Sequence, residues 1–129
     1  MSYQLQEINR RIDQDVKGFL EACDAQYANK VSQAADTILN NLSTSPIVLL
    51  SGPSGSGKTT TALKIEEELE KRGVLSHTIS MDNYFKTLNP KTVPRTKDGS
   101  IDFESPLCMD MDLLNDHFAK LSRGETIIV

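Results

Sequence analysis

Eight consecutive residues of this sequence have the types and spacing that hold the phosphates of a nucleoside triphosphate. Gly-Pro-Ser-Gly-Ser-Gly-Lys-Thr, from Gly52 to Thr59, fits the pattern Gly-x-x-x-x-Gly-Lys-(Ser/Thr). Glycines allow a tight turn in which successive backbone N–H groups point at phosphate oxygens, and the N-terminus of a following helix adds positive charge. Lys58 is expected to reach the β- and γ-phosphates as a catalytic residue, and the Thr59 hydroxyl is expected to bind Mg²⁺.

The predicted cofactor-binding residues are this motif and the threonine that follows it: Gly52, Pro53, Ser54, Gly55, Ser56, Gly57, Lys58, Thr59 and Thr60. The alternative is an ordinary Gly/Ser linker. A linker has no need to lie between an apolar run and an amphipathic helix, which is the context that phosphate binding requires. The motif alone does not distinguish a kinase from a GTPase, a motor ATPase or a transporter.

Asp82 is a second candidate for chemistry. It stands in Ser-Met-Asp-Asn-Tyr-Phe-Lys, directly after a predicted strand. Because the carboxyl ends of parallel strands meet at one edge of a sheet, Asp82 is expected to face the γ-phosphate and its metal. A carboxylate there can accept the proton of an attacking hydroxyl and contribute to the Mg²⁺ site. The alternative is a loop aspartate that caps a turn.

The segments around the motif predict a strand, a helix and a second strand. Residues 47–50, Ile-Val-Leu-Leu, form a short apolar run typical of a buried parallel strand, and residues 74–80 alternate like another strand. Residues 59–72 have a helical pattern that ends at Gly73. The residues of this helix predicted to face a sheet are Ala62, Ile65 and Leu69. The predicted fold class is therefore α/β, with a P-loop NTPase-type parallel sheet preceded by an N-terminal helical segment.

Residues 1–44 form the predicted helical segment. Apolar residues recur there every three or four positions without a strict heptad, which favours one or two packing helices, broken near Gly18 or Asp24, over a coiled coil. We expect a cap over the next domain or a subunit interface, and the second would make the protein a homo-oligomer. The polar stretch 41–46 marks the boundary, so the predicted kinase-like domain is 45–129.

The C-terminal part predicts a loop followed by one more helix and a strand. The helix is expected to begin at Pro106 or Asp110 and to end at Arg123. Residues 126–129 are an apolar run typical of another strand. Because the sequence stops within that run, we expect the natural protein to continue beyond it.

Composition excludes several classes of protein. The 129 residues carry a net charge of −4, which gives no electrostatic reason to expect nucleic acid or an anionic membrane as a partner. No run approaches the roughly 20 apolar residues of a membrane-spanning helix, and the N-terminus lacks the layout of a signal peptide, so we predict a cytoplasmic protein. Cys23 and Cys108 predict reduced, buried thiols without a metal site, and His77 and His117 are interpreted as structural.

Four segments together resemble the uridine kinase branch of the phosphoribulokinase/uridine kinase family, over about residues 46–129. They are Gly-Pro-Ser-Gly-Ser-Gly-Lys-Thr-Thr-Thr, Ser-Met-Asp-Asn-Tyr-Phe-Lys, Ile-Asp-Phe-Glu-Ser-Pro at 101–106 and Asp-Met-Asp-Leu-Leu at 110–114. The resemblance implies that Asp82 is the catalytic base, that Glu104 holds the ribose hydroxyls and that Phe103 lines the nucleoside pocket. Phe85, also assigned to substrate binding, replaces the family's tyrosine. Glu104 replaces its aspartate and Ser105 its histidine, which leaves the acceptor open.

The function implied by the resemblance is transfer of the ATP γ-phosphoryl group to the 5′-OH of uridine or cytidine, with ATP and Mg²⁺ as cofactors. The alternatives are another acceptor, such as ribulose 5-phosphate, pantothenate or glycerate, or a non-catalytic nucleotide-binding module. The family's later strand, acidic residue and Arg-bearing lid would lie beyond residue 129, so this chain is expected to hold only part of a kinase site. The basic residues of the loop, expected either to neutralise phosphate or to be solvated, are Lys86, Lys91, Arg95 and Lys97.

Overall fold

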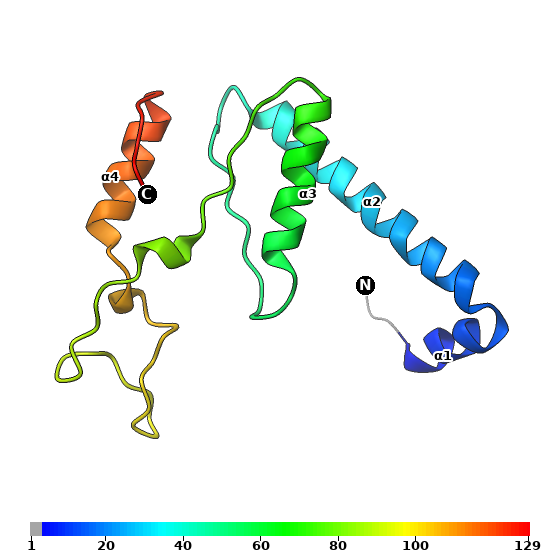
Figure 1. Cartoon of the computed structure of the whole chain (residues 1–129), viewed down its shortest axis with the longest axis horizontal. Coiled ribbons are helices and arrows are strands. Elements are labelled where there is room, and N and C mark those ends of the chain that lie inside the picture. Colours follow the sequence, from blue (N-terminus) through cyan, green and yellow to red (C-terminus); the bar gives the residue numbers. More distant parts are fainter. Residues whose placement is uncertain (1–3) are drawn as a thin grey trace. The chain divides into compact units, whose positions relative to one another are not determined.

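The computed structural model describes residues 4–129, so the first three residues of the predicted helical segment lie outside the described part. Its helices are α1 (Leu5–Gln14), α2 (Val16–Asn41), α3 (Lys58–Lys71) and α4 (Met111–Ser122), with 3-10 turns η1 (Met81–Tyr84) and η2 (Pro106–Cys108) (Figure 1). They form two compact units. The first combines the described residues up to Thr44 with Leu50–Ser76, and the second combines Ser45–Leu49 with His77–Val129.

The N-terminal segment consists of two helices, as predicted, but the break lies at Asp15. The Asp15 carboxylate accepts a hydrogen bond of 3.0 Å from the Gly18 N–H and so caps α2. A Cβ on Gly18 would lie 2.2 Å from Asp15 Oδ2, so the glycine leaves room for this cap. Gly18 and Asp24, where the break was expected, both lie inside α2, because a capping carboxylate starts a helix more effectively than a glycine interrupts one.

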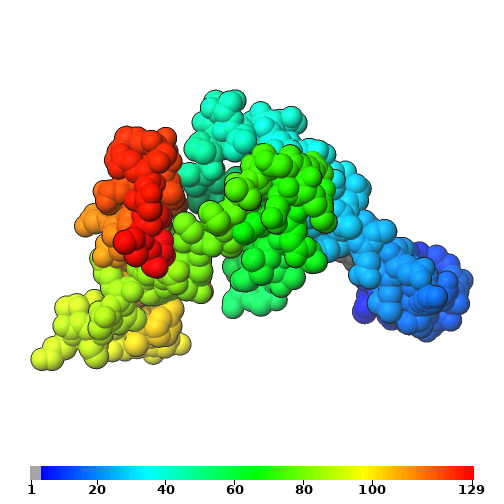
Figure 2. Space-filling view, turned by 45° about the horizontal axis from the view of Figure 1, so that its top comes forward, coloured from blue at the N-terminus to red at the C-terminus, as the bar shows by residue number. Residues whose placement is uncertain are grey.

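In the first unit α3 packs along α2 (Figure 2). The buried residues of these two helices are Val31, Ala35 and Leu69. At the end of α3 the Arg72 guanidinium bonds Glu68 Oε1 at 2.9 Å and Ser32 Oγ at 2.7 Å, and it also pairs with Asp36. Leu69 was expected to face a sheet, and in this structure the partner of its helix is α2.

The limits of α3 and α4 agree with the sequence signals. Gly73 has a φ of +81°, its N–H bonds Glu70 O at 2.9 Å, and Val74 N–H bonds Leu69 O at 3.0 Å, which is the Schellman arrangement. The predicted helix 59–72 is confirmed as α3 to within one residue at each end. Of the two starts considered for α4, Asp110 is its N-cap.

The predicted parallel sheet is not observed in this structure. Within residues 4–129 no strand is formed, and the only β-type pairings are the isolated bridges Phe85–Met109 and Arg95–Ile101. Segments 47–50, 74–80 and 126–129 are irregular, and Leu49 is 71% exposed. An apolar run favours a strand, but its backbone groups also need a neighbouring strand to bond, and that pairing is absent here.

The second unit has a small buried nucleus around α4 and η1. The buried residues are Tyr84, Val93, Cys108, Leu114 and His117. Two backbone hydrogen bonds join residues 84–86 to residues 108–110. They run from Lys86 N–H to Cys108 O (2.9 Å) and from Asp110 N–H to Tyr84 O (2.7 Å). Among the described residues, no helix has the length and apolar character needed to cross a membrane.

Candidate functional site

The phosphate-binding motif folds into a tight loop at the start of α3. Gly55 and Gly57 have φ values of +70° and +82°, a region that side-chain-bearing residues rarely adopt. A Cβ at either position would meet no atom within 4 Å, so backbone conformation, and not lack of space, requires glycine here. Ser56 N–H closes a turn on Pro53 O at 3.2 Å. The sequence motif therefore adopts the glycine-dependent turn that its chemistry needs.

Gly52 serves the loop differently. A Cβ there would lie 3.0 Å from Ser56 Oγ and 3.5 Å from Lys58 Cγ, so the absence of a side chain allows the loop to close over it. The Lys58 ammonium donates a 2.8 Å hydrogen bond to Pro53 O and thus lies across the loop. A phosphate oxygen would compete with this neutral carbonyl for the ammonium, and charge favours the phosphate.

The N-terminus of α3 is open. Gly57 is its N-cap and no side chain caps it, while Lys58, Thr59 and Thr60 are its first three residues. Backbone N–H groups at such an end have no partner inside the helix and attract anions. The side chain of Thr59 is exposed, so its hydroxyl is accessible to a hydrated Mg²⁺. The donor types of this loop fit a phosphate chain with its metal.

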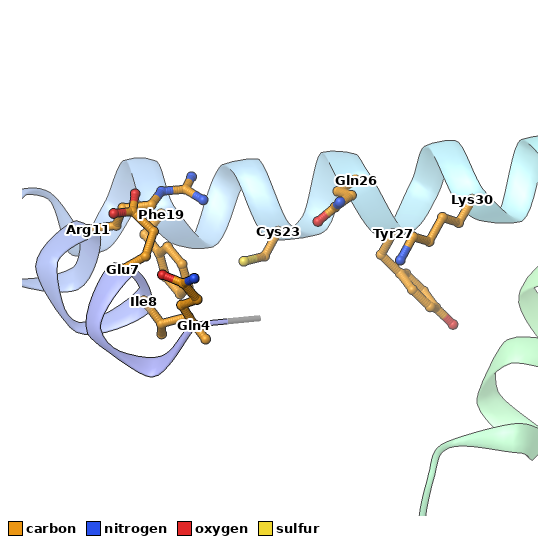
Figure 3. A pocket seen from close by; sticks show the side chains of 9 residues that line it. All are labelled: Gln4, Glu7, Ile8, Arg11, Phe19, Cys23, Gln26, Tyr27 and Lys30. Carbon is orange, nitrogen blue, oxygen red and sulfur yellow. The ribbon is translucent and has the colours of Figure 1, made fainter. Parts of the chain in front are cut away.

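Tyr27 of α2 contacts this helix one turn further on, a feature that sequence reasoning missed. Its hydroxyl lies 3.0 Å from Thr61 Oγ1, and Figure 3 shows the ring projecting from α2 toward α3. Tyr27 stands within a helical stripe of apolar residues, and nothing in its spacing signals a partner in α3. Only the packing of the two helices reveals it.

A hollow of about 680 Å³ lies between α1 and α2 (Figure 3). Its lining includes Ile8, Phe19, Cys23 and Tyr27, and the Arg11 guanidinium stacks 5.1 Å from the Phe19 ring centroid. No residue of the phosphate-binding motif lines it. The glycine-rich loop lies at the surface, with residues 52–57 exposed.

Asp82 lies in η1 with its side chain exposed. Ser80 caps this turn, since its Oγ accepts a hydrogen bond of 3.2 Å from the Asp82 N–H. No side chain among residues 4–129 bonds the Asp82 carboxylate, which leaves it available to a substrate hydroxyl or a metal's water shell. The described part of the chain contains no cluster of three side chains able to ligate a metal, so any Mg²⁺ there would rely on phosphate oxygens and water as well.

The predicted acceptor residues belong to the same unit as Asp82. Phe103 is 58% exposed and Glu104 is exposed, in a chain of turns where the Glu104 N–H bonds Asp102 Oδ1 at 3.2 Å. The Cys108 thiol, fully buried, donates to Asp102 O at 3.3 Å and ties these turns to the nucleus. Phe85 is also exposed and pairs with Met109 through an isolated bridge.

The predicted site residues therefore fall into two groups, one in each unit. The phosphate-binding loop belongs to the first unit, and Asp82, Phe85, Phe103 and Glu104 belong to the second. The assignment of these residues to catalysis and to acceptor binding stays a prediction.

In the basic loop, residues 86–97, the Arg95 side chain is hydrogen-bonded to backbone carbonyls. Arg95 donates to Gly99 O at 2.7 Å and to Pro90 O at 3.3 Å, so its guanidinium holds the loop's shape. Thr96 and Ser100 hydrogen-bond the Asp98 carboxylate, which lowers the pKa of that group to about 2. The loop lysines are exposed, as expected for a solvated surface.

Comparison with known proteins agrees with the motifs. The chain is 36% identical to a uridine kinase of Schizosaccharomyces pombe over 78 residues, which is 60% of this chain and 17% of that protein. It is 31% identical to a uridine kinase of Saccharomyces cerevisiae over 83 residues, which is 64% of this chain and 16% of that protein. The chain therefore spans about a sixth of the length of these relatives. No solved structure matches it.

The family model described as Phosphoribulokinase / Uridine kinase family matches residues 47–129, well over half of the sequence. The matched region begins at the apolar run before the phosphate-binding loop and includes every predicted site residue, whereas α1 and α2 precede it. The chain belongs to the phosphoribulokinase/uridine kinase family.

Proposed function

We propose that this chain contributes the phosphate-binding loop and the catalytic base of an ATP-dependent kinase that phosphorylates the 5′-OH of uridine or cytidine. The observation that carries the proposal is the conformation of the loop. Gly55 and Gly57 have positive φ, Lys58 lies across the turn, and the N-terminus of α3 is uncapped. These features support a phosphate site, in a member of a kinase family whose relatives named above are uridine kinases.

Each residue has a separate role in the proposed reaction. Lys58 and the first N–H groups of α3 hold the phosphates and stabilise negative charge as the phosphoryl group moves. Asp82 takes the proton of the acceptor hydroxyl, whose oxygen attacks the γ-phosphorus while the bond to the ADP oxygen breaks. Thr59 would hold Mg²⁺, with Asp82 contributing to the same site, and the bound ion would supply positive charge that offsets part of the phosphate charge.

The acceptor is assigned to the second unit. Glu104 would accept hydrogen bonds from the ribose hydroxyls, and Phe85 and Phe103 offer exposed aromatic faces for a base. Ribulose 5-phosphate, pantothenate and glycerate are alternative acceptors, because Glu104 and Ser105 differ from the family's usual residues. A nucleotide-binding module without catalysis is the alternative outside the enzymes.

The proposal also includes the parallel sheet, the division of the chain, its compartment and its oligomeric state. Residues 47–50 and 74–80 would pair as parallel strands in the P-loop NTPase manner, bringing the end of the second strand, and with it Asp82, to the phosphate-binding edge. Residues 1–44 would form a helical N-terminal segment and 45–129 the N-terminal part of a kinase domain, in a cytoplasmic protein that acts on small molecules and can form a homo-oligomer.

The decisive experiment compares Asp82→Asn with wild type in the natural full-length protein. Asp82→Asn is expected to keep ATP affinity within a few-fold and to lower kcat by roughly 10² to 10⁴, the effect of losing a general base. Asp112→Asn, an exposed aspartate of the same unit, is the matched control and should keep kcat. Steady-state kinetics with uridine, cytidine and the alternative acceptors, at two Mg²⁺ concentrations, separate a missing base from a metal defect.

Two outcomes would contradict the proposal. A kcat for Asp82→Asn within about threefold of wild type would mean that another group is the base. A full-length protein that binds ATP and phosphorylates none of these acceptors would favour the nucleotide-binding module. In either case Lys58→Ala should still weaken ATP binding, because Lys58 belongs to the phosphate loop itself.

A further inference from the structure

Tyr84 and His117 form a buried polar pair that the proposed reaction does not use. They are only 3% and 6% exposed. The Tyr84 hydroxyl lies 2.9 Å from His117 Nδ1, and the rings meet edge to face with centroids 5.6 Å apart. Buried polar groups are costly to leave unpaired, so each ring holds the other in one orientation.

Helix α4 holds Tyr84 at two points. Tyr84 O accepts a 2.7 Å hydrogen bond from the N–H of Asp110, whose carboxylate caps α4 through Leu113 N–H at 3.0 Å. The Tyr84 hydroxyl reaches His117, about two turns further along the same helix. One residue is therefore fixed to α4 by both its backbone and its side chain.

Asp82 lies in the same single turn as Tyr84. The turn contains the hydrogen bonds Asn83 N–H to Ser80 O at 3.2 Å and Phe85 N–H to Asp82 O at 3.3 Å. At the N-terminal side of the turn, the Ser80 hydroxyl accepts the hydrogen bond from the Asp82 N–H. A 3-10 turn has poorer hydrogen-bond geometry than an α-helix, so contacts from outside the turn help to hold its shape. The anchoring of Tyr84 therefore contributes to the orientation of the Asp82 carboxylate, together with the Lys86 N–H to Cys108 O bond that follows the turn.

We propose that Tyr84 and His117 are positioning residues that hold η1, and with it the Asp82 carboxylate, in the orientation needed for proton transfer. The inference rests on the proposed function, in which Asp82 is the base. An apolar pair would fill the same space, but it would lack the directional bond between the Tyr84 hydroxyl and His117 Nδ1. Both side chains are buried, so the pair acts through Asp82.

Tyr84→Phe is the sharpest test, because it removes one hydroxyl and keeps the ring. In the full-length protein it should lower kcat by about 10- to 100-fold, the scale of a misplaced catalytic group, with the KM for ATP unchanged. In an Asp82→Asn background it should cause no further loss, because the group it positions is already absent. His117→Gln, which can still bond the hydroxyl, should retain more activity than His117→Leu, and His77→Gln, at an exposed site, should behave as wild type.

A readout independent of activity completes the test. Hydrogen exchange of the amides of Asn83 and Phe85 should be faster in Tyr84→Phe, while the amides of α3 keep their rates. Unchanged exchange in a folded variant, wild-type kcat, or losses that multiply in the double variant would each overturn the positioning role. Wild-type kcat in Asp82→Asn alone would instead overturn the proposed base, and the exchange rates would still decide whether the pair holds the turn.

Discussion

Replacing Gly57 with alanine isolates the contribution of loop conformation to phosphate binding. Gly57 has a φ of +82° and open space around its missing Cβ, so the only penalty for alanine is the left-handed backbone. That penalty is about 1–2 kcal/mol. If the free loop relaxes to negative φ, ATP must restore the native turn, and its affinity should fall about 5- to 30-fold at about 1.4 kcal/mol per tenfold change.

Gly73 provides a matched control at the other end of the same helix. Its φ is +81° and its surroundings are equally open, so Gly73→Ala has the same backbone cost without touching the loop. Titration calorimetry of ATP with the full-length protein should show weakened binding for Gly57→Ala only. Gly57→Asn should bind more tightly than Gly57→Ala, because asparagine tolerates the left-handed region.

Urea unfolding of the same variants measures how much each alanine lowers the free energy of unfolding. Gly73→Ala should lose up to about 1–2 kcal/mol of unfolding free energy, and Gly57→Ala should lose less wherever its loop relaxes. Wild-type ATP affinity in Gly57→Ala, or equal weakening in the two alanine variants, would show that the positive φ of Gly57 does not organise the phosphate site.

Two further predictions concern the thiols and one carboxylate. Cys108 is fully buried as expected, but the expectation was wrong for Cys23, which is exposed on α2. A thiol reagent should therefore modify Cys23 in the native chain and Cys108 only on unfolding, and Cys23→Ser should abolish the fast modification. The hydrogen bonds of Thr96 and Ser100 lower the pKa of Asp98 to about 2 from an ordinary value of 3.8, so the stability they provide is present above about pH 4 and is lost as pH falls through about 2. The difference in melting temperature between wild type and Asp98→Asn should therefore be constant near neutrality and disappear in strong acid; a difference that persists there would contradict it.

The local features of this protein follow from its sequence. The glycines of the phosphate loop, the end of α3 at Gly73 and the start of α4 at Asp110 depend on the conformations and hydrogen bonds of a few adjacent residues. The order of motifs was also sufficient to indicate the family, which the match over residues 47–129 confirms. The break was expected near Gly18 or Asp24 and lies at Asp15, three residues before Gly18, because the Asp15 carboxylate caps α2.

Tertiary structure decided which surfaces meet. The periodicity of α3 predicts an apolar face but not its partner, and here that helix packs on α2, joined by Tyr27 to Thr61 and by Arg72 to Ser32. The sequence could mark His117 as structural, yet its bond to Tyr84 links residues 33 positions apart. Strand pairing is non-local in the same way, and it is the part of the predicted fold that residues 4–129 do not contain in this structure. Helices, turns and caps satisfy their backbone groups within a few residues, whereas packing partners and strand neighbours are chosen by the whole chain.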